Sequence, residues 1–166
     1  ERVSKLKVGD PLEPGTDVGA IVSRQHFDKI MSYIDLAQEE GGSILTGGKQ
    51  IHLDGRCRDG WFIEPTIIEG LSHECRTNQE EIFGPVVTIM PFDSEDEVLD
   101  YADSVRYGLS STIWTENLSR AHRVAAMASP GHGSGGSTGA SVPQAMSAPA
   151  AARLPSGNAR AVRVPI

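Results

Sequence analysis

The sequence EEIFGPV, from Glu80 to Val86, joins a pair of acids to the most apolar run of the chain. The run from Val86 to Met90 is apolar at every position except Thr88, which predicts a buried strand. Two acids before an apolar turn can place one carboxylate outward while Ile82 and Phe83 pack inward. The stretch therefore predicts an acidic turn that leads into the core of a sheet.

Glu80 and Glu81 are candidates for binding a sugar. A carboxylate can accept hydrogen bonds from the two neighbouring hydroxyls of a ribose at once. Gly84 allows a close backbone approach or a positive φ before the strand begins. The alternative is an ordinary helix end, a turn and a strand, with both acids solvated. Residue types alone favour this alternative.

Three helices are predicted from apolar spacing and capping residues. The first follows Ser23 and has apolar residues at positions 27, 30, 31, 34 and 37. The second follows Ser94, which forms a capping box with Glu97. The third begins after Asn117 or Ser119, either of which can accept hydrogen bonds from the first helical turn.

Strands are predicted at residues 43–46, 61–68, 86–90 and 109–114. Pro65 lies within the second of these and predicts an edge position or a kink. A strand at 86–90, a helix and a strand at 109–114 form a βαβ unit, which implies a right-handed crossover between parallel strands. The expected fold class is α/β, with a mainly parallel sheet.

Composition limits the classes of protein that fit. The chain has 166 residues and a net charge of −7, which suits one domain and argues against a nucleic-acid partner. No apolar run approaches the roughly 18 residues that cross a bilayer. The first residues carry no secretory signal, and the missing Met predicts a chain cut from something longer. Cys57 and Cys75 lack C-x-x-C spacing, which favours a reduced, cytoplasmic setting.

The last 39 residues, 128–166, differ from the rest. They contain three arginines, no acid and no aromatic residue, and Ala, Gly, Pro and Ser supply 26 of them. Such a segment cannot bury enough apolar surface to offset the entropy lost on ordering. We expect a domain at residues 1–127 and a disordered tail at residues 128–166. The glycines of Ser129–Gly136 do not form a phosphate-binding loop, because no Lys-Ser/Thr pair follows them.

Several further pieces carry a family resemblance. They are KVGDPLEPGTDVG from Lys7, FIEPT from Phe62, YGLS from Tyr107 and IWTENLSRAHRVA from Ile113. Together with EEIFGPV, they make residues 5–127 resemble the catalytic domain of the aldehyde dehydrogenase superfamily. The branch looks like the enzymes acting on 2-aminomuconate or 2-hydroxymuconate semialdehyde.

The resemblance implies a chemistry and two site residues. Members of the family oxidise an aldehyde to a carboxylic acid through a Cys thioester, with hydride transfer to NAD or NADP. By position, Glu81 would meet the ribose of the cofactor and Phe83 its nicotinamide. The implied partner is a small aldehyde, and the resemblance leaves a homo-oligomer open.

The chain also departs from the family. There the nucleophilic Cys, the general-base Glu and the main nucleotide-binding fold all precede the segment that begins here at Lys7. We therefore expect a C-terminal fragment that has no catalytic residue and is inactive alone. After Ala125 the family's next strand is replaced by unrelated sequence, which predicts a frame-shifted or alternatively spliced end. The alternative is a non-catalytic truncated product that binds full-length subunits or is unstable.

Other reactive side chains receive ordinary interpretations. His73 and Arg76 flank Cys75 and could lower its thiol pKa, but an unreactive surface cysteine is the better interpretation. The histidines show no metal spacing, and His26 is expected on a solvated helix face. Glu64 is interpreted as a strand or interface residue, because a general base must lie beside a nucleophile.

Overall fold

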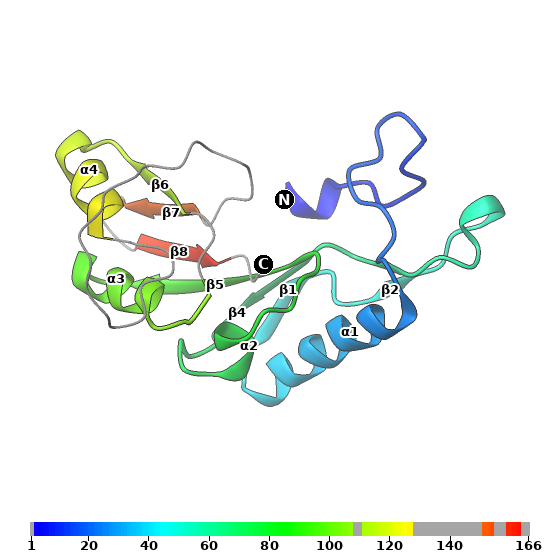
Figure 1. The fold of residues 1–166 in the computed structure, drawn as a ribbon, viewed down its shortest axis with the longest axis horizontal. Coiled ribbons are helices and arrows are strands. Elements are labelled where there is room, and N and C mark those ends of the chain that lie inside the picture. Colours follow the sequence, from blue (N-terminus) through cyan, green and yellow to red (C-terminus); the bar gives the residue numbers. More distant parts are fainter. Residues whose placement is uncertain (1, 108–110, 128–150, 155–158, 164–166) are drawn as a thin grey trace.

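The structure is a computed structural model that describes residues 2–107, 111–127, 151–154 and 159–163 (Figure 1). The helices among these residues are α1 (Arg24–Glu39), α2 (Arg76–Gln79), α3 (Glu95–Asp103) and α4 (Leu118–Met127), with short 3₁₀ turns at Val3–Lys5 and Gly55–Cys57. The strands are β1 (Ser43–Thr46), β2 (Gln50–Ile51), β3 (Phe62–Ile63), β4 (Thr66–Glu69), β5 (Val86–Phe92), β6 (Thr112–Thr115), β7 (Ala151–Leu154) and β8 (Ala159–Arg163). None of the helices in the described ranges has the length and apolar character that a membrane span requires.

Within the described residues, six strands form one sheet in the order β1-β4-β5-β8-β7-β6. The pairs β4–β5 and β6–β7 are parallel, whereas β1–β4, β5–β8 and β7–β8 are antiparallel. The predicted α/β class is confirmed. The sheet is mixed rather than mainly parallel, because β1 and the β7–β8 pair add antiparallel neighbours.

The predicted crossover from β5 through α3 to β6 is present. The pairing directions make β5 and β6 parallel to each other in one sheet, with β8 and β7 between them. Sequence spacing could predict the direction but not the two intervening strands. The predicted strand at 109–114 begins at Thr112 in the structure, and residues 108–110 lie outside the described part.

The disordered tail stays a prediction, although the structure describes two short strands within it, at residues 151–154 and 159–163. Their backbones form β7 and β8, which pair with β6 and β5. A strand joins a ladder through backbone donors and acceptors, so the lack of large apolar side chains does not prevent pairing. Residues 128–150, 155–158 and 164–166 lie outside the described part, and the prediction for them stays a prediction.

Capping residues set the helix ends as expected. The Ser23 hydroxyl accepts a hydrogen bond from the backbone of His26 at 3.2 Å, and Gly41, with a φ of 90°, follows the end of α1. Ser94 caps α3, and Asn117 caps α4 by accepting from the backbone N–H of Arg120 at 3.0 Å. Pro65 separates β3 from β4, which join different sheets, so the strand predicted at 61–68 is interrupted there.

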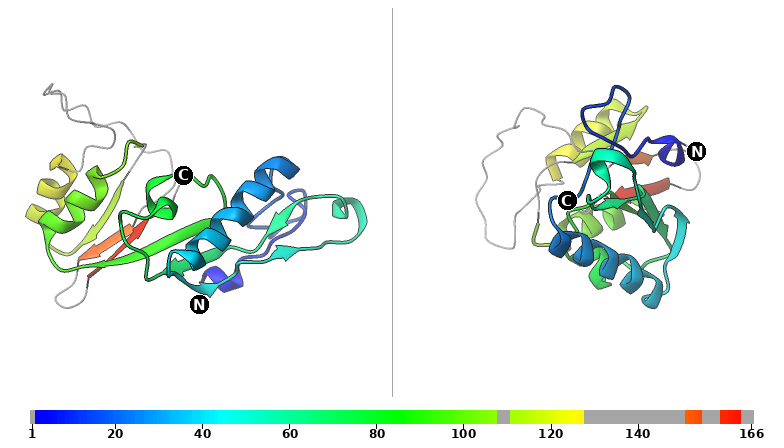
Figure 2. Two further views of the ribbon diagram at one scale, coloured as in Figure 1. Left: turned by 90° about the horizontal axis from the view of Figure 1, so that it is seen from below. Right: turned by 90° about the vertical axis from the view of Figure 1, so that its right-hand side faces the viewer.

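The main core lies between α1 and the strands β4 and β5. Its nine buried residues include Phe27, Ile30 and Ile34 of α1, together with Ile82 and Val86. A smaller cluster joins Phe92 to Val98 of α3. Val86 and Phe92 have the same parity along β5, so both clusters lie on one face of the sheet. Figure 2 shows α1, α3 and α4 on this same side.

Candidate functional site

The segment Glu80–Gly84 lies along one face of α1. Four residues of the helix meet it, at the spacing of i, i+3, i+4 and i+7 that puts side chains on one face. Each of them meets a different residue of the segment. The helix residues are His26, Lys29, Ile30 and Tyr33, and they meet Phe83, Glu81, Gly84 and Glu80 respectively.

Phe83 has its aromatic ring directed outward. Its side chain is 62% exposed, and its φ of 58° lies in the left-handed region that non-glycine residues rarely adopt. The Phe83 carbonyl accepts a hydrogen bond from Nε2 of His26 at 2.6 Å, and the two rings meet edge to face at 6.0 Å. The prediction that Phe83 packs inward is wrong, because the left-handed backbone turns its side chain away from Ile82.

Ile82 and Gly84 fix the segment to the helix by packing. Ile82 is fully buried in the main core, as predicted. A Cβ added at Gly84 would lie 2.7 Å from Cδ1 of Ile30, so no larger residue fits there without movement. Of the two roles predicted for Gly84, the structure shows the close approach, and the positive φ belongs to Phe83 instead.

The two acids of the segment are used differently. The Glu80 carboxylate accepts hydrogen bonds from the Tyr33 hydroxyl and from Nε of Arg76 at 2.9 Å. These partners, Arg76 first and then Tyr33, lower the pKa of Glu80 to about 2. Burial and the adjacent Glu80 carboxylate raise the pKa of Tyr33. Glu80 is thus a structural anchor between α1 and α2.

Glu81 keeps its carboxylate available. Its backbone carbonyl accepts a hydrogen bond from Nζ of Lys29 at 2.7 Å, and its residue is half-buried. In the part of the chain that the structure describes, no hydrogen bond or ion pair engages the carboxylate itself. An unpaired acid beside an exposed aromatic ring can bind sugar hydroxyls and a flat heterocycle together.

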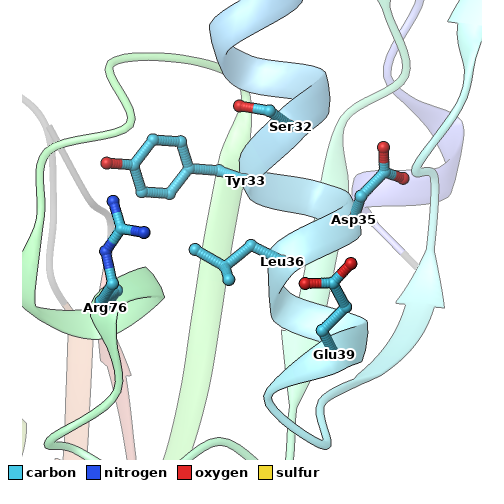
Figure 3. A pocket seen from close by; sticks show the side chains of 6 residues that line it. All are labelled: Ser32, Tyr33, Asp35, Leu36, Glu39 and Arg76. Carbon is cyan, nitrogen blue, oxygen red and sulfur yellow. The ribbon is translucent and has the colours of Figure 1, made fainter.

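A surface hollow of ≈ 330 Å³ lies beside this segment but does not include it. Figure 3 shows Tyr33 and Arg76 directed toward one another at one end, with Asp35 and Glu39 along α1. Glu81 and Phe83 are not among the residues that line it. The hollow therefore does not coincide with the predicted cofactor segment. The one cation that lines it, Arg76, is already paired with Glu80.

Cys75 does not have the environment of an activated thiol. Burial, together with the Glu40 carboxylate beside it, raises its pKa, although backbone hydrogen bonds to the sulfur oppose this. Arg76 is bound to Glu80, and His73 stacks on Tyr101 with ring centroids 4.7 Å apart. The two flanking residues that could have lowered the pKa are therefore engaged elsewhere. The described residues contain no group of acids, histidines and cysteines able to hold a metal ion.

Sequence reasoning missed the helix side of the site. His26 was expected on a solvated face, yet it is half-buried and bound to Phe83. Lys29 and Tyr33 were not singled out. The signal was available in the spacing of 26, 29, 30 and 33, but nothing in the sequence indicates that α1 packs against a segment 47 to 57 residues later.

These features define an α/β protein with an exposed aromatic ring and an unpaired carboxylate on one turn, and its similarity to known proteins places it in a family. The family model described as "Aldehyde dehydrogenase family" matches residues 1–138, so the chain belongs to the aldehyde dehydrogenase family. This confirms the resemblance found in the motifs.

Individual relatives are consistent with this placement. The chain is 49% identical over 124 residues to 2-aminomuconic 6-semialdehyde dehydrogenase of Pseudomonas sp, covering 75% of this chain and 25% of the relative. It is 44% identical over 127 residues to 5-carboxymethyl-2-hydroxymuconate semialdehyde dehydrogenase of Escherichia coli, covering 75% and 27%. A point mutant of betaine aldehyde dehydrogenase from Staphylococcus aureus, in complex with NAD+, matches with a TM-score of 0.68 and 39% identity, covering 76% and 26%. The chain thus spans about a quarter of the length of these relatives.

Proposed function

We propose that this chain supplies a cofactor-contacting segment of an NAD(P)-dependent aldehyde dehydrogenase. Glu81 binds the ribose hydroxyls next to the nicotinamide, and Phe83 packs against the nicotinamide ring. The observation that carries the proposal is the outward ring of Phe83, 62% exposed on a positive-φ backbone, next to an unpaired carboxylate. The NAD+ bound in the related betaine aldehyde dehydrogenase supports the choice of ligand.

The chemical division of labour follows from this placement. When bound, NAD(P) accepts a hydride from the substrate carbon, so that an aldehyde is oxidised to the level of a carboxylic acid. Glu81 fixes the ribose by two hydrogen bonds, and Phe83 limits the positions open to the ring. Both residues therefore act on the orientation of the cofactor rather than on bond breaking.

The nucleophile and the general base are proposed to come from residues other than those of this chain. The raised pKa of Cys75 supports this, because the thiolate is the reactive form. We expect the 166-residue chain alone to form no NADH from an aldehyde and NAD+. NADH formed by the purified chain would contradict this part of the proposal. A semialdehyde substrate is proposed from the names of the two muconate-type relatives.

Glu81→Gln tests the cofactor role directly. The variant is made in a chimera in which residues 5–127 replace the matching quarter of the Staphylococcus aureus betaine aldehyde dehydrogenase. Loss of one charged hydrogen-bonding partner should weaken NAD+ affinity about tenfold and slow hydride transfer. Acylation of the nucleophilic thiol should continue, which stopped-flow and burst measurements separate.

Glu39→Gln is the matched control for this experiment. Glu39 is an exposed acid that lines the neighbouring hollow and does not touch the cofactor segment. It should leave NAD+ affinity unchanged. Equal NAD+ affinity and turnover for Glu81→Gln and the parent chimera would remove Glu81 from the proposed site.

A further inference from the structure

We infer that His26 is the positioning residue for Phe83: it holds the left-handed turn that presents the aromatic ring to the nicotinamide. The inference rests on the proposed function, because it assigns a role to the ring of Phe83. It concerns a residue of α1 that lies 57 positions away in sequence from the residue it positions.

Phe83 needs an external restraint to keep its conformation. A φ of 58° brings Cβ of an L-residue close to the following carbonyl, so aromatic residues seldom adopt it. Such a conformation persists only where the surroundings over-determine it. The ring itself supplies little restraint, because most of its surface is exposed.

His26 restrains both parts of Phe83. A carbonyl has no proton to give, so Nε2 of His26 must carry the hydrogen of the 2.6 Å hydrogen bond. The imidazole also meets the phenyl ring at an interplanar angle of 66°, the edge-to-face arrangement that aromatic rings favour. The His26 side chain therefore fixes the direction of the Phe83 carbonyl and limits the positions open to the Phe83 ring.

The position of His26 suits this role because its own backbone is fixed. It lies in the first turn of α1, where its N–H is bound by the capping hydroxyl of Ser23. The next turns of the same helix hold the residues on either side of Phe83. Lys29 binds the carbonyl of Glu81, and Ile30 packs against Gly84. With its neighbours held, the remaining freedom of the segment is at Phe83, where His26 acts.

The test uses the complete 166-residue chain labelled with 4-fluorophenylalanine. The chain has four phenylalanines, and the signal that disappears in Phe83→Leu identifies Phe83. In His26→Ala we expect this fluorine signal to move toward the position of the free amino acid. In His26→Gln, whose side-chain amide can still donate to the carbonyl, it should stay near its original position.

Two controls separate positioning from a general structural effect. Gln25→Ala changes the adjacent, exposed residue of the same helix turn and should leave the Phe83 signal in place. Gln25→Ala should keep its unfolding midpoint within about 2 °C of the original chain, and the two variants of the half-buried His26 within about 4 °C. A Phe83 signal unaltered by His26→Ala would overturn the inference.

Titration with NAD+ distinguishes this failure from failure of the proposed function. This titration uses the chimera with betaine aldehyde dehydrogenase, which supplies the rest of the enzyme, and Phe83→Leu again identifies the Phe83 signal. The signal should shift as NAD+ is added, and His26→Ala should weaken the NAD+ affinity read from that shift about five- to tenfold. A signal that responds to NAD+ equally in the parent chimera and in its His26→Ala variant removes His26 but leaves the proposed function intact. A signal that moves in His26→Ala but never responds to NAD+ contradicts the proposed function, and with it the cofactor part of the inference.

Discussion

The two ends of the sheet face are held together by different forces. On the α1 side, nine buried residues form the main core, and the segment Glu80–Gly84 contributes Ile82 to it. On the α3–α4 side, the smaller cluster contains only Phe92 and Val98 as buried members. There, Glu95 of α3 forms ion pairs with Arg120 and Arg123 of α4. Nη2 of Arg123 lies 2.6 Å from Oε2 of Glu95. The proposed site thus lies on the side with the larger buried core.

Packing against the main core explains how the turn at Phe83 can be exposed and still be held in place. Phe83 faces solvent, but its two neighbours, Ile82 and Gly84, are locked against the core. A loop fixed in this way can present a side chain to a ligand without a large ordering cost on binding. Among the described residues, the buried cluster on the α3–α4 side is smaller and consists of Phe92 and Val98.

The largest effect is expected when the shared core residue is truncated. Ile82→Ala removes a fully buried side chain and should lower the free energy of unfolding by about 2–5 kcal/mol. Leu99→Ala is the matched change on the α3 side, where Leu99 is 7% exposed. Its loss of unfolding free energy should lie at or below the lower end of that range. Urea denaturation of both variants compares the sides, and a greater loss for Leu99→Ala would reverse the comparison.

Gly84→Ala tests the locking of the turn itself. The new methyl would lie within 3.1 Å of three carbon atoms of Ile30, which is fully buried and has no room to move aside. Overpacking of this kind costs about 1–3 kcal/mol. Gly19→Ala is the control, because its added Cβ would meet only Pro11, at ordinary contact distances of 3.7 and 4.0 Å. Similar unfolding curves for the two variants would show that the turn is not tightly packed on α1.

Local patterns predicted much of this fold, because they act over a few residues. Apolar spacing and Ser23 predicted α1, and the capping box of Ser94 and Glu97 predicted the start of α3. Pairings between distant segments were not predictable in the same way. The places of β7 and β8 in the sheet depend on backbone hydrogen bonds, which leave no mark on composition.

For the candidate site as well, local patterns were predictable and contacts between distant segments were not. EEIFGPV predicted Glu81 and Phe83 through the family resemblance, and local chemistry predicted that Gly84 allows a close approach. The sequence did not predict the outward ring of Phe83, because its direction depends on a contact with His26 across the fold. The sequence also could not show which carboxylate, that of Glu80 or that of Glu81, is bound by other side chains. Only the positions of Tyr33 and Arg76 show that Glu80 is the bound acid.

The smallest effect is expected where charge, rather than packing, anchors the turn. The pKa of Glu80 is about 2 in the folded chain, below its ordinary value of 4.5. The ionised carboxylate therefore stabilises the fold above about pH 4.5, and this contribution is lost as the pH falls toward 2. Since the side chain is 34% exposed, we expect no more than about 1 kcal/mol. Glu80→Gln should thus be slightly less stable than the original chain at pH 7, with the two unfolding curves converging near pH 2.

Glu39→Gln, which removes an acid from the same surface, should keep the acid dependence of the original chain. A difference between Glu80→Gln and the original chain that persists undiminished at pH 2 would mean that the amide disturbs packing. Glu80 would then hold the turn through packing, as Ile82 and Gly84 do.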